Sequence, residues 1–283
     1  MTLAPLAAAD LPSALLAGTA LGLACAVLSV FVILRRWALI GEGVSHSGFG
    51  GAGTAWMLAV LVPGWNTPGV VLALAVAACL GAALGIGWLG RRERVNGDAA
   101  IGIFLVASLA WGFLAASVYR HHFVTEPVGW DQFLTGDVRS VSPRFAWSAA
   151  FVCGAVVLVM AGLGKEILSY CFDPTLAQAS GVRAAFVHYL MMGLIGVTVV
   201  VGMRATGTVL VPALLVLPGA AAVRVTDRLG RTFAVAIGVG VVGSVGGLLI
   251  ATRWAFVPAG PAIVLVLLAL FAATLLVPRR AVA

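Results

Sequence analysis

Two ionisable residues stand four positions apart in Ala38-Leu-Ile-Gly-Glu-Gly-Val-Ser-His-Ser47, a segment otherwise built of small and apolar residues. On an α-helix this spacing places Glu42 and His46 on one face, one turn apart, so that their side chains converge. A carboxylate oxygen and an imidazole nitrogen are ligands that suit Zn²⁺, Mn²⁺ or Fe²⁺ rather than Cu⁺ or Ca²⁺. The pair is therefore a candidate metal site, and the alternative is a structural hydrogen bond between the two side chains.

Other residues with metal-binding side chains form weaker candidates. His121 and His122 precede Glu126 in a polar segment and are candidate metal contacts, although an exposed polar loop is the simpler interpretation. His188 stands in an apolar run and is interpreted as a packing or interfacial residue. A zinc metalloprotease needs the helical pattern His-Glu-x-x-His, and the stretch Glu-x-x-x-His that ends at His46 supplies only one of its two histidines.

Motifs for nucleotide binding fail on their surroundings. Gly238-Val-Gly-Val-Val-Gly243 matches the dinucleotide-binding pattern but lies inside a long apolar run, where helix packing is the better interpretation. Lys165 follows Gly164 but precedes Glu166 instead of Ser or Thr, so it does not complete a phosphate-binding loop. We therefore expect no enzymatic activity, no ATP hydrolysis and no covalently bound cofactor in this chain.

Composition assigns the chain to the membrane proteins. Of its 283 residues, 62% are hydrophobic and only 10% are charged, whereas soluble domains carry about 25% charged residues. The formal net charge of +7 comes from short basic clusters between apolar runs, a distribution typical of membrane topology signals and not of a nucleic-acid-binding face. The scattered cysteines form no CxxC pair and are interpreted as packing residues; they are Cys25, Cys79, Cys153 and Cys171.

Apolar runs of about 20 residues predict an all-α integral membrane protein, a polytopic bundle of about nine transmembrane helices in a single domain over residues 1–283. The runs are continuous, unlike the alternating strands of a membrane barrel. Eight and ten spans remain alternatives, because the first span and the tight connection at 204–206 are weak points. Residues 1–10 lack the basic region of a cleaved signal peptide, so the first run predicts a retained helix. The expected spans cover residues 13–34, 38–60, 68–90, 99–118, 145–163, 185–203, 207–223, 232–251 and 261–277.

Basic residues predict the orientation of these spans. If the spans alternate, twelve of the 17 Lys and Arg residues fall on one side, which is the cytoplasmic side by the positive-inside rule. The C-terminus is then expected inside and the N-terminus outside. The twelve are Arg35, Arg36, Arg91, Arg92, Arg94, Lys165, Arg183, Arg224, Arg228, Arg231, Arg279 and Arg280.

Two connections are too long for simple turns. The outer one, at 121–144, mixes aromatic and charged residues and is interpreted as an interfacial or partly re-entrant segment. The inner one, at about 164–184, predicts a short helix in Thr-Leu-Ala-Gln-Ala-Ser, with Asp173 as its cap, Pro174 at its first helical position and Gly181 as its end. A docking element for a soluble partner and a surface helix at the lipid headgroups remain equal alternatives.

The stretch Val32-Ile-Leu-Arg-Arg-Trp-Ala-Leu-Ile-Gly-Glu-Gly-Val-Ser-His46 resembles the signature of the permease subunits of bacterial zinc-, manganese- and iron-type ABC transporters. In that family an arginine pair and apolar residues lead into Gly-Asp-Ala-Leu-Ser-His. Further matches follow in the same order, so the resemblance covers nearly the whole chain. They are Asn96-Gly-Asp-Ala-Ala-Ile-Gly102, Phe133-Leu-Thr-Gly136, Phe172-Asp-Pro-Thr-Leu-Ala-Gln-Ala-Ser-Gly181 and Gly207-Thr-Val-Leu-Val-Pro-Ala-Leu-Leu-Val-Leu-Pro-Gly219.

The resemblance implies a transport subunit for a divalent metal ion, Mn, Zn or Fe, in the bacterial inner or plasma membrane. It implies a second permease subunit, either an identical copy or a paralogue, two copies of a cytoplasmic ATP-binding subunit, and an extracytoplasmic metal-binding protein. Glu42 and His46 match the family's Asp and His, which would hold the transported ion within the membrane. The coupling helix that would contact the ATPase contains Asp173, Pro174, Ala177 and Gly181.

Three positions depart from the family's pattern and leave the identity of the metal open. Glu42 stands for Asp, Gly43 for Ala, and Pro212 for a residue that is more usually small and hydroxylated. A secondary metal-ion carrier is the main alternative function; it would depend on an ion gradient and normally carries more intramembrane acidic residues. An intramembrane metalloenzyme is a weaker alternative, because its second histidine ligand is missing.

Overall fold

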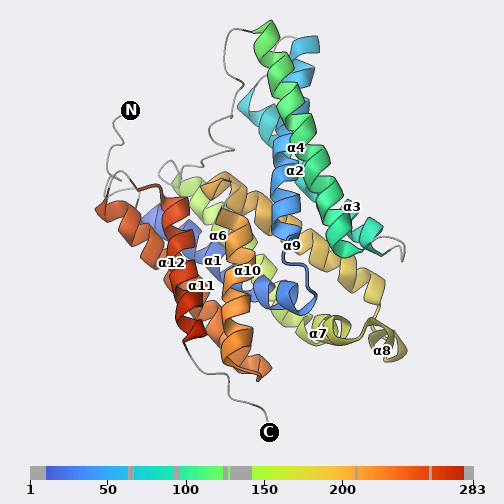
Figure 1. The fold of residues 1–283 in the computed structure, drawn as a ribbon, viewed down its shortest axis with the longest axis vertical. Coiled ribbons are helices and arrows are strands. Elements are labelled where there is room, and N and C mark those ends of the chain that lie inside the picture. The colour runs from blue at the N-terminus through green and yellow to red at the C-terminus, as the bar shows by residue number, and fades with distance from the viewer. Residues whose placement is uncertain are drawn as a thin grey trace.

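The computed structural model describes residues 11–62, 65, 67–91, 96–123, 127, 142–207, 210–254 and 257–276, and Figure 1 shows that the described residues form a bundle of helices. No strand occurs among these residues, so the all-α prediction is confirmed. The helices are α1 (Leu11–Leu34), α2 (Ile40–Leu61), α3 (Pro68–Gly90), α4 (Gly97–His122), α6 (Pro143–Gly162), α7 (Gly164–Phe172), α8 (Pro174–Ala179), α9 (Ala184–Thr206), α10 (Leu210–Val225), α11 (Leu229–Arg253) and α12 (Ala259–Leu275).

Each expected span coincides with one of the longer helices, but the expected count of about nine spanning helices is not confirmed. The described residues form eleven helices, of which α1, α3, α4, α6, α9 and α11 are long and apolar enough to cross a membrane. α10 and α12 are apolar but have only 16 and 17 residues. α2 has 22 residues, but Glu42, His46 and many glycines interrupt its apolar sequence.

Two connections differ from the expectation. The prediction of a tight connection at 204–206 is wrong, because these residues belong to α9, which continues to Thr206. The next residue, Gly207, caps the helix with a φ of 79°. Glycine adopts this left-handed conformation without a Cβ clash, which makes it a common residue just after a helix. The inner connection holds two helices instead of one, since α7 precedes the expected short helix α8.

Two groups of helices pack together through α9 (Figure 1). In one group α2 packs along α3 and α4; in the other, α1 contacts α6, α10 and α11, and α12 contacts α10 and α11. α9 contacts α2 and α3 of the first group and α1, α6 and α10 of the second. The first turn of α2 lies where the groups meet, because Gly41 packs against Pro212 of α10.

Glycines allow α2 to pack closely against α4, because residues without a side chain let helix backbones approach each other. A Cβ at Gly50 would lie 3.1 Å from the Cα of Ser108, and one at Gly53 would lie 2.8 Å from the Cα of Gly112. Gly81 in α3 is different, because a Cβ there would meet no atom within 4 Å. Close packing therefore explains the glycines of α2 but not every glycine of the chain.

The glycine pattern of α11 is also a packing feature. Gly238–Gly243 lies within the helix and not between a strand and a helix, which removes the dinucleotide-binding interpretation. A Cβ at Gly240 would approach the backbone of Gly22 in α1 to 2.8 Å. The four cysteines are buried and unpaired, as expected for packing residues.

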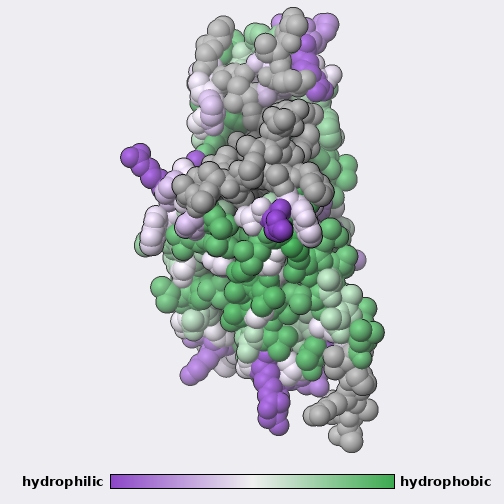
Figure 2. All heavy atoms as spheres, turned by 90° about the vertical axis from the view of Figure 1, so that its left-hand side faces the viewer, coloured by the Kyte–Doolittle hydropathy of each residue, from purple (hydrophilic) through white to green (hydrophobic). Residues whose placement is uncertain are grey.

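The surface is apolar around the middle of the molecule. Figure 2 shows a broad zone of hydrophobic residues, with hydrophilic side chains below it and others above it on the same face. Trp147, Phe151 and Leu158 on α6 are among the exposed large apolar side chains. An apolar surface of this extent is stable in lipid and not in water. The fold is therefore that of a multi-pass membrane protein.

Candidate functional site

The start of α2 is set by the end of α1. Arg36 has a φ of 58°, and the amide of Trp37 donates to the carbonyl of Val32 at 2.9 Å, a pattern that ends helices by turning the chain away from the axis. α2 then begins at Ile40, which places Glu42 in its first turn. A carboxylate in that position is stabilised by the partial positive charge of the helix N-terminus.

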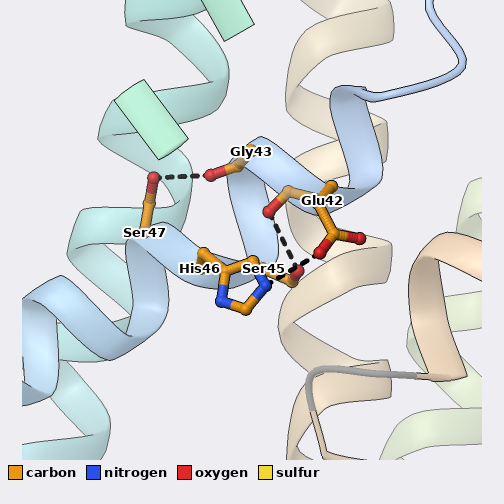
Figure 3. A network of polar contacts seen from close by, with 5 residues as sticks. All are labelled: Glu42, Gly43, Ser45, His46 and Ser47. Carbon is orange, nitrogen blue, oxygen red and sulfur yellow. Dashed lines mark hydrogen bonds and ion pairs between the residues drawn. The ribbon is translucent and has the colours of Figure 1, made fainter. Parts of the chain in front are cut away.

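Glu42 and His46 converge as their spacing predicts. Nε2 of His46 lies 2.9 Å from Oε1 of Glu42, and Figure 3 shows the two groups directed toward each other on the same side of α2. The side chains are 42% and 24% exposed for Glu42 and His46, so both can be reached from outside the protein interior. Because a carboxylate only accepts, the bond requires a proton on Nε2, and the lone pair of a neutral ring then lies on Nδ1.

The nearby serines do not take part in the pair. The hydroxyl of Ser45 donates to the carbonyl of Glu42 at 3.1 Å, and that of Ser47 donates to the carbonyl of Gly43 at 2.7 Å (Figure 3). Both hydroxyls are therefore satisfied by the helix backbone. The carboxylate and the imidazole remain the ionisable ligands that α2 offers at this point.

Two protein ligands are fewer than a bound metal ion normally has. Among the residues that the structure describes, no group of three or more His, Cys, Asp and Glu side chains is close enough to hold a metal. The observed hydrogen bond is also what the structural alternative predicts. The geometry therefore establishes a converging pair, and its role as an ion site is a proposal.

Two of the departures from the family pattern pack beside this pair. A Cβ at Gly43 would lie 2.8 Å from Cγ2 of Ile101 and 3.3 Å from its carbonyl oxygen, so alanine would require α4 to shift. Pro212 lies against Gly41, one residue before Glu42. Both substitutions therefore change the packing of the first turn of α2, on which Glu42 is carried.

The predicted coupling loop is capped at both ends. Oδ1 of Asp173 accepts from the amides of Thr175 and Leu176 at 2.8 and 3.1 Å, and Pro174 follows at the first helical position. Hydrogen bonds from the Thr175 hydroxyl and from these two amides lower the pKa of the Asp173 carboxyl. The cap geometry agrees with the sequence prediction.

The other end of α8 has the expected glycine. Gly181 has a φ of 88°, and the amides of Gly181 and Val182 donate to the carbonyls of Gln178 and Ala177, both at 3.0 Å. These two bonds form a Schellman motif. Ala177 is buried, so it anchors the short helix against the rest of the chain.

The sequence analysis missed α7 and the polar contacts around it. Ile167, Tyr170 and Cys171 are buried at helical spacing, a signal that could have indicated an amphipathic helix. His188 is buried, as the packing interpretation predicts. It also links three helices, because its Nε2 donates to the carbonyl of Gly87 at 2.9 Å and its Nδ1 lies 2.8 Å from the Tyr170 hydroxyl.

The structure does not bring the other candidate metal contacts, at the C-terminal end of α4, together with Glu42 and His46 on α2. His121 and His122 lie in its last turn and are exposed. Nδ1 of His122 donates to the carbonyl of Val118 at 3.0 Å, which leaves Nε2 as its available nitrogen. Glu126 and the match at 133–136 lie outside the described residues.

Comparison with known proteins connects the chain to one family. The sequence profile of the ABC 3 transport family matches residues 9–278. The manganese transport system membrane protein MntC of Halalkalibacterium halodurans is 34% identical over 263 residues, which cover 93% of this chain and 85% of that protein. The chelated iron transport system membrane protein YfeD of Yersinia pestis is 30% identical over 251 residues, covering 87% of this chain and 78% of that protein.

A solved structure supports the same relationship. The structure described as PsaBC from Streptococcus pneumoniae in complex with Fab contains a chain that matches with a TM-score of 0.76 and 26% identity. The match covers 95% of this chain and 91% of that chain. Both sequence relatives are named as membrane proteins of transport systems and not as enzymes.

Proposed function

This chain belongs to the ABC 3 transport family, and we propose that it is the permease subunit of a plasma-membrane importer for manganese or iron ions. The names of the two sequence relatives support these ions. The contact between His46 and Glu42 carries the proposal at the level of residues. Zinc stays among the ions to be tested, because a carboxylate and an imidazole suit it as well.

The pair can exchange its shared proton for the ion. Two ligand atoms that are each about 2.1 Å from one metal ion and about 90° apart lie about 3 Å from each other. Nε2 and Oε1 are already 2.9 Å apart, so both could bind one ion with little movement once Nε2 gives up its proton. In a neutral ring that proton would move to Nδ1, whereas an imidazolium ring would have to release one proton, so ion binding would weaken as the pH falls.

A second permease subunit would complete the coordination. One chain offers two protein ligands at α2, whereas Mn²⁺ favours about six ligands, mostly oxygens. A twofold axis near α2 would bring a second carboxylate and a second imidazole to the same ion, and the rest of the shell would be water. This arrangement also places the transport path between the two subunits.

The α7 and α8 segment would transmit the movement of cytoplasmic ATP-binding subunits. Phe172 and Leu176 are 66% and 68% exposed at its tip, where apolar side chains suit a protein groove. The caps at Asp173 and Gly181 stiffen the short helix. In this arrangement the C-terminus lies in the cytoplasm, and an extracytoplasmic metal-binding protein delivers the ion at the opposite end.

Uptake by the reconstituted complex tests the proposal. The permease and its ATP-binding subunit are placed in vesicles with the metal-binding protein, and uptake of Mn, Fe and Zn is measured with and without ATP. We expect His46→Ala to lower ATP-dependent uptake by about tenfold or more, because one of two ligands is lost. Ser45→Ala changes a neighbour of His46 whose hydroxyl donates to the helix backbone and not to the pair, and it serves as the matched control.

Two results would count against the proposal. Uptake by His46→Ala at the rate of the parent would remove the pair from the transport path. Uptake that proceeds without the ATP-binding subunit and follows a proton or sodium gradient would instead favour a secondary carrier.

A further inference from the structure

A cavity of about 360 Å³ lies where α7 and α8 meet the longer helices. Its wall is formed by the connection between α1 and α2, the end of α3, the start of α4, α7, α8 and the first part of α9. Its volume falls in the range of small-molecule sites, about 300–1,000 Å³. It is separate from the Glu42 and His46 pair, neither of which lines it.

Two arginines dominate the charge of this cavity. Arg35 and Arg91 both line it, and no Asp or Glu belongs to its described lining. Among the described residues, no carboxylate lies within ion-pair distance of either arginine. The ion pair found there joins His46 and Glu42. The cavity therefore carries positive charge that the described part of the chain does not neutralise.

The arginine side chains are oriented by aromatic rings that leave donors unused. The guanidinium of Arg35 lies 5.1 Å from the ring centre of Trp37 and 4.6 Å from that of Tyr170, and Arg91 lies 5.6 Å from the ring centre of Tyr189. Rings cover the faces of a guanidinium, so its N–H groups remain available in the plane. Nε of Arg35 is buried and has no hydrogen-bond partner.

A chain of hydrogen bonds holds Arg35 in place. Its Nη2 donates to the Tyr170 hydroxyl at 3.2 Å, and that hydroxyl contacts Nδ1 of His188 at 2.8 Å. Since Nε2 of His188 donates to the carbonyl of Gly87, Nδ1 accepts the tyrosine proton. Burial raises the pKa of Tyr170, while the charges of Arg35 and Arg91 act in the opposite direction.

Helix ends add partial positive charge at the same place. Ile40, Gly97 and Ala184, the first residues of α2, α4 and α9, all line the cavity. None of these helices has a side-chain hydrogen bond from its capping residue. The amides of Ile40 and Ala184 donate to the carbonyls of Trp37 and Val182, so these two helix ends add partial positive charge rather than free donors. The acidic residue nearest in sequence to this set, Asp98, is exposed and does not line the cavity.

We propose that this cavity binds a phosphate group, either free phosphate or the headgroup phosphate of an anionic phospholipid. Guanidinium groups present paired donors that match the oxygens of a phosphate. A site between the ends of membrane helices is also at the level of lipid headgroups. Pro174 and Gln178 of α8 line the same cavity, so the bound phosphate would brace α8 against the helix bundle. The site is independent of the transported ion.

Binding is measured on the full chain in nanodiscs of phosphatidylcholine. One arm follows equilibrium binding of radiolabelled inorganic phosphate; the other adds phosphatidylglycerol and counts the bound lipids by native mass spectrometry. Arg35→Gln and Arg91→Gln each remove one cation from the cavity. Arg36→Gln makes the same change of charge at the exposed neighbour of Arg35, which does not line the cavity, and is the matched control.

We expect Arg35→Gln and Arg91→Gln to weaken binding by about tenfold or more, the effect of losing a charge-assisted hydrogen bond. Arg36→Gln should stay within about twofold of the parent. Phosphate binding that depends on both arginines identifies a free anion, whereas phosphatidylglycerol retention without phosphate binding identifies a lipid headgroup. Arg35→Lys keeps the charge but loses the paired donors, so it should weaken binding by less than Arg35→Gln.

Two outcomes overturn the proposal. The first is a parent that binds neither phosphate nor phosphatidylglycerol above phosphatidylcholine. The second is binding by Arg35→Gln and Arg91→Gln that equals that of Arg36→Gln. Elution volume and melting temperature, both measured without phosphate, show whether each variant is folded. Arg91 lies at the exposed end of α3, so Arg91→Gln still tests the proposal if Arg35→Gln does not fold.

Discussion

A hydrogen bond between neighbouring turns of α2 orients both candidate ligands before any ion arrives. Nε2 of His46 and Oε1 of Glu42 are 2.9 Å apart, and one proton lies between them. A site whose ligands are already oriented needs less rearrangement to bind. The longer acid at position 42 is compatible with this contact, although the family's pattern has Asp there.

Changing the acid tests how its length matters. Glu42→Asp shortens the side chain by one methylene, so we expect the contact with His46 to be lost and the preference between Mn²⁺ and Zn²⁺ to change by roughly fivefold or more. Glu42→Gln keeps the length and removes the charge, and it should weaken the binding of both ions by about tenfold. Titration of each ion into the purified permease measures both effects. Unchanged binding by Glu42→Gln would contradict a ligand role for the carboxylate.

The helix α8 has six residues, and a helix of that length is not stable in water by itself. Its caps therefore decide whether it forms. Asp173 satisfies the first amides, and Gly181 allows the two bonds that close the other end. Ala177 packs inward, while Leu176 points its apolar side chain to the surface. The element therefore presents one exposed apolar side, which suits the docking role proposed for it.

The Asp173 cap predicts a pH dependence of this helix. Its pKa is lowered in the folded protein, so the carboxylate stabilises α8 fully above the unfolded-state pKa of about 3.9. The stabilisation is lost as the pH falls through the lower folded pKa. At pH 7 we expect Asp173→Ala to speed hydrogen exchange at the amides of Thr175 and Leu176 by roughly fivefold or more.

Asn is the matched control for this prediction, because Asp173→Asn can cap the helix but cannot titrate. Exchange rates corrected for their intrinsic pH dependence should, in the parent, approach those of Asp173→Ala as the pH falls through the lowered folded-state pKa of Asp173. In Asp173→Asn they should not change over the same acid titration. A parent whose protection stays constant until the whole protein unfolds in acid would refute the capping role of the charge.

On the scale of the whole molecule, α9 contacts both groups of helices, and α2 begins at their junction, where Gly41 lies against Pro212 of α10. This position leaves Glu42 and His46 partly exposed and open to a second subunit. The described residues offer no third ligand nearby. The complete ion site would then be a property of two chains and not of one.

Stoichiometry tests that arrangement. We expect one high-affinity metal ion for every two permease chains, measured by metal analysis of the purified complex after dialysis. Complexes that contain one parent chain and one His46→Ala chain should bind the ion about tenfold more weakly or not at all. One ion per chain, with affinity unaffected by the mixed partner, would rule out a shared site.

Several features of this protein follow from the sequence by itself, because they depend on neighbouring residues. Apolar runs locate the long helices, the spacing of Glu42 and His46 predicts their contact, and Asp173 and Gly181 mark the ends of α8. Each of these signals lies within one or two helical turns. The expected count of about nine spanning helices is not confirmed, because α10 and α12 are short and α2 is rich in glycine.

Only the tertiary structure decided the features that join distant residues. Arg35 and Tyr170 are 135 positions apart, and no local period relates them. α7 spans nine residues, and although their spacing is helical, the sequence does not say which distant helices its buried face contacts. The cavity between Arg35 and Arg91 exists because the ends of separate helices meet there. Helix packing, which depends on side chains from the whole chain at once, brings those charges together.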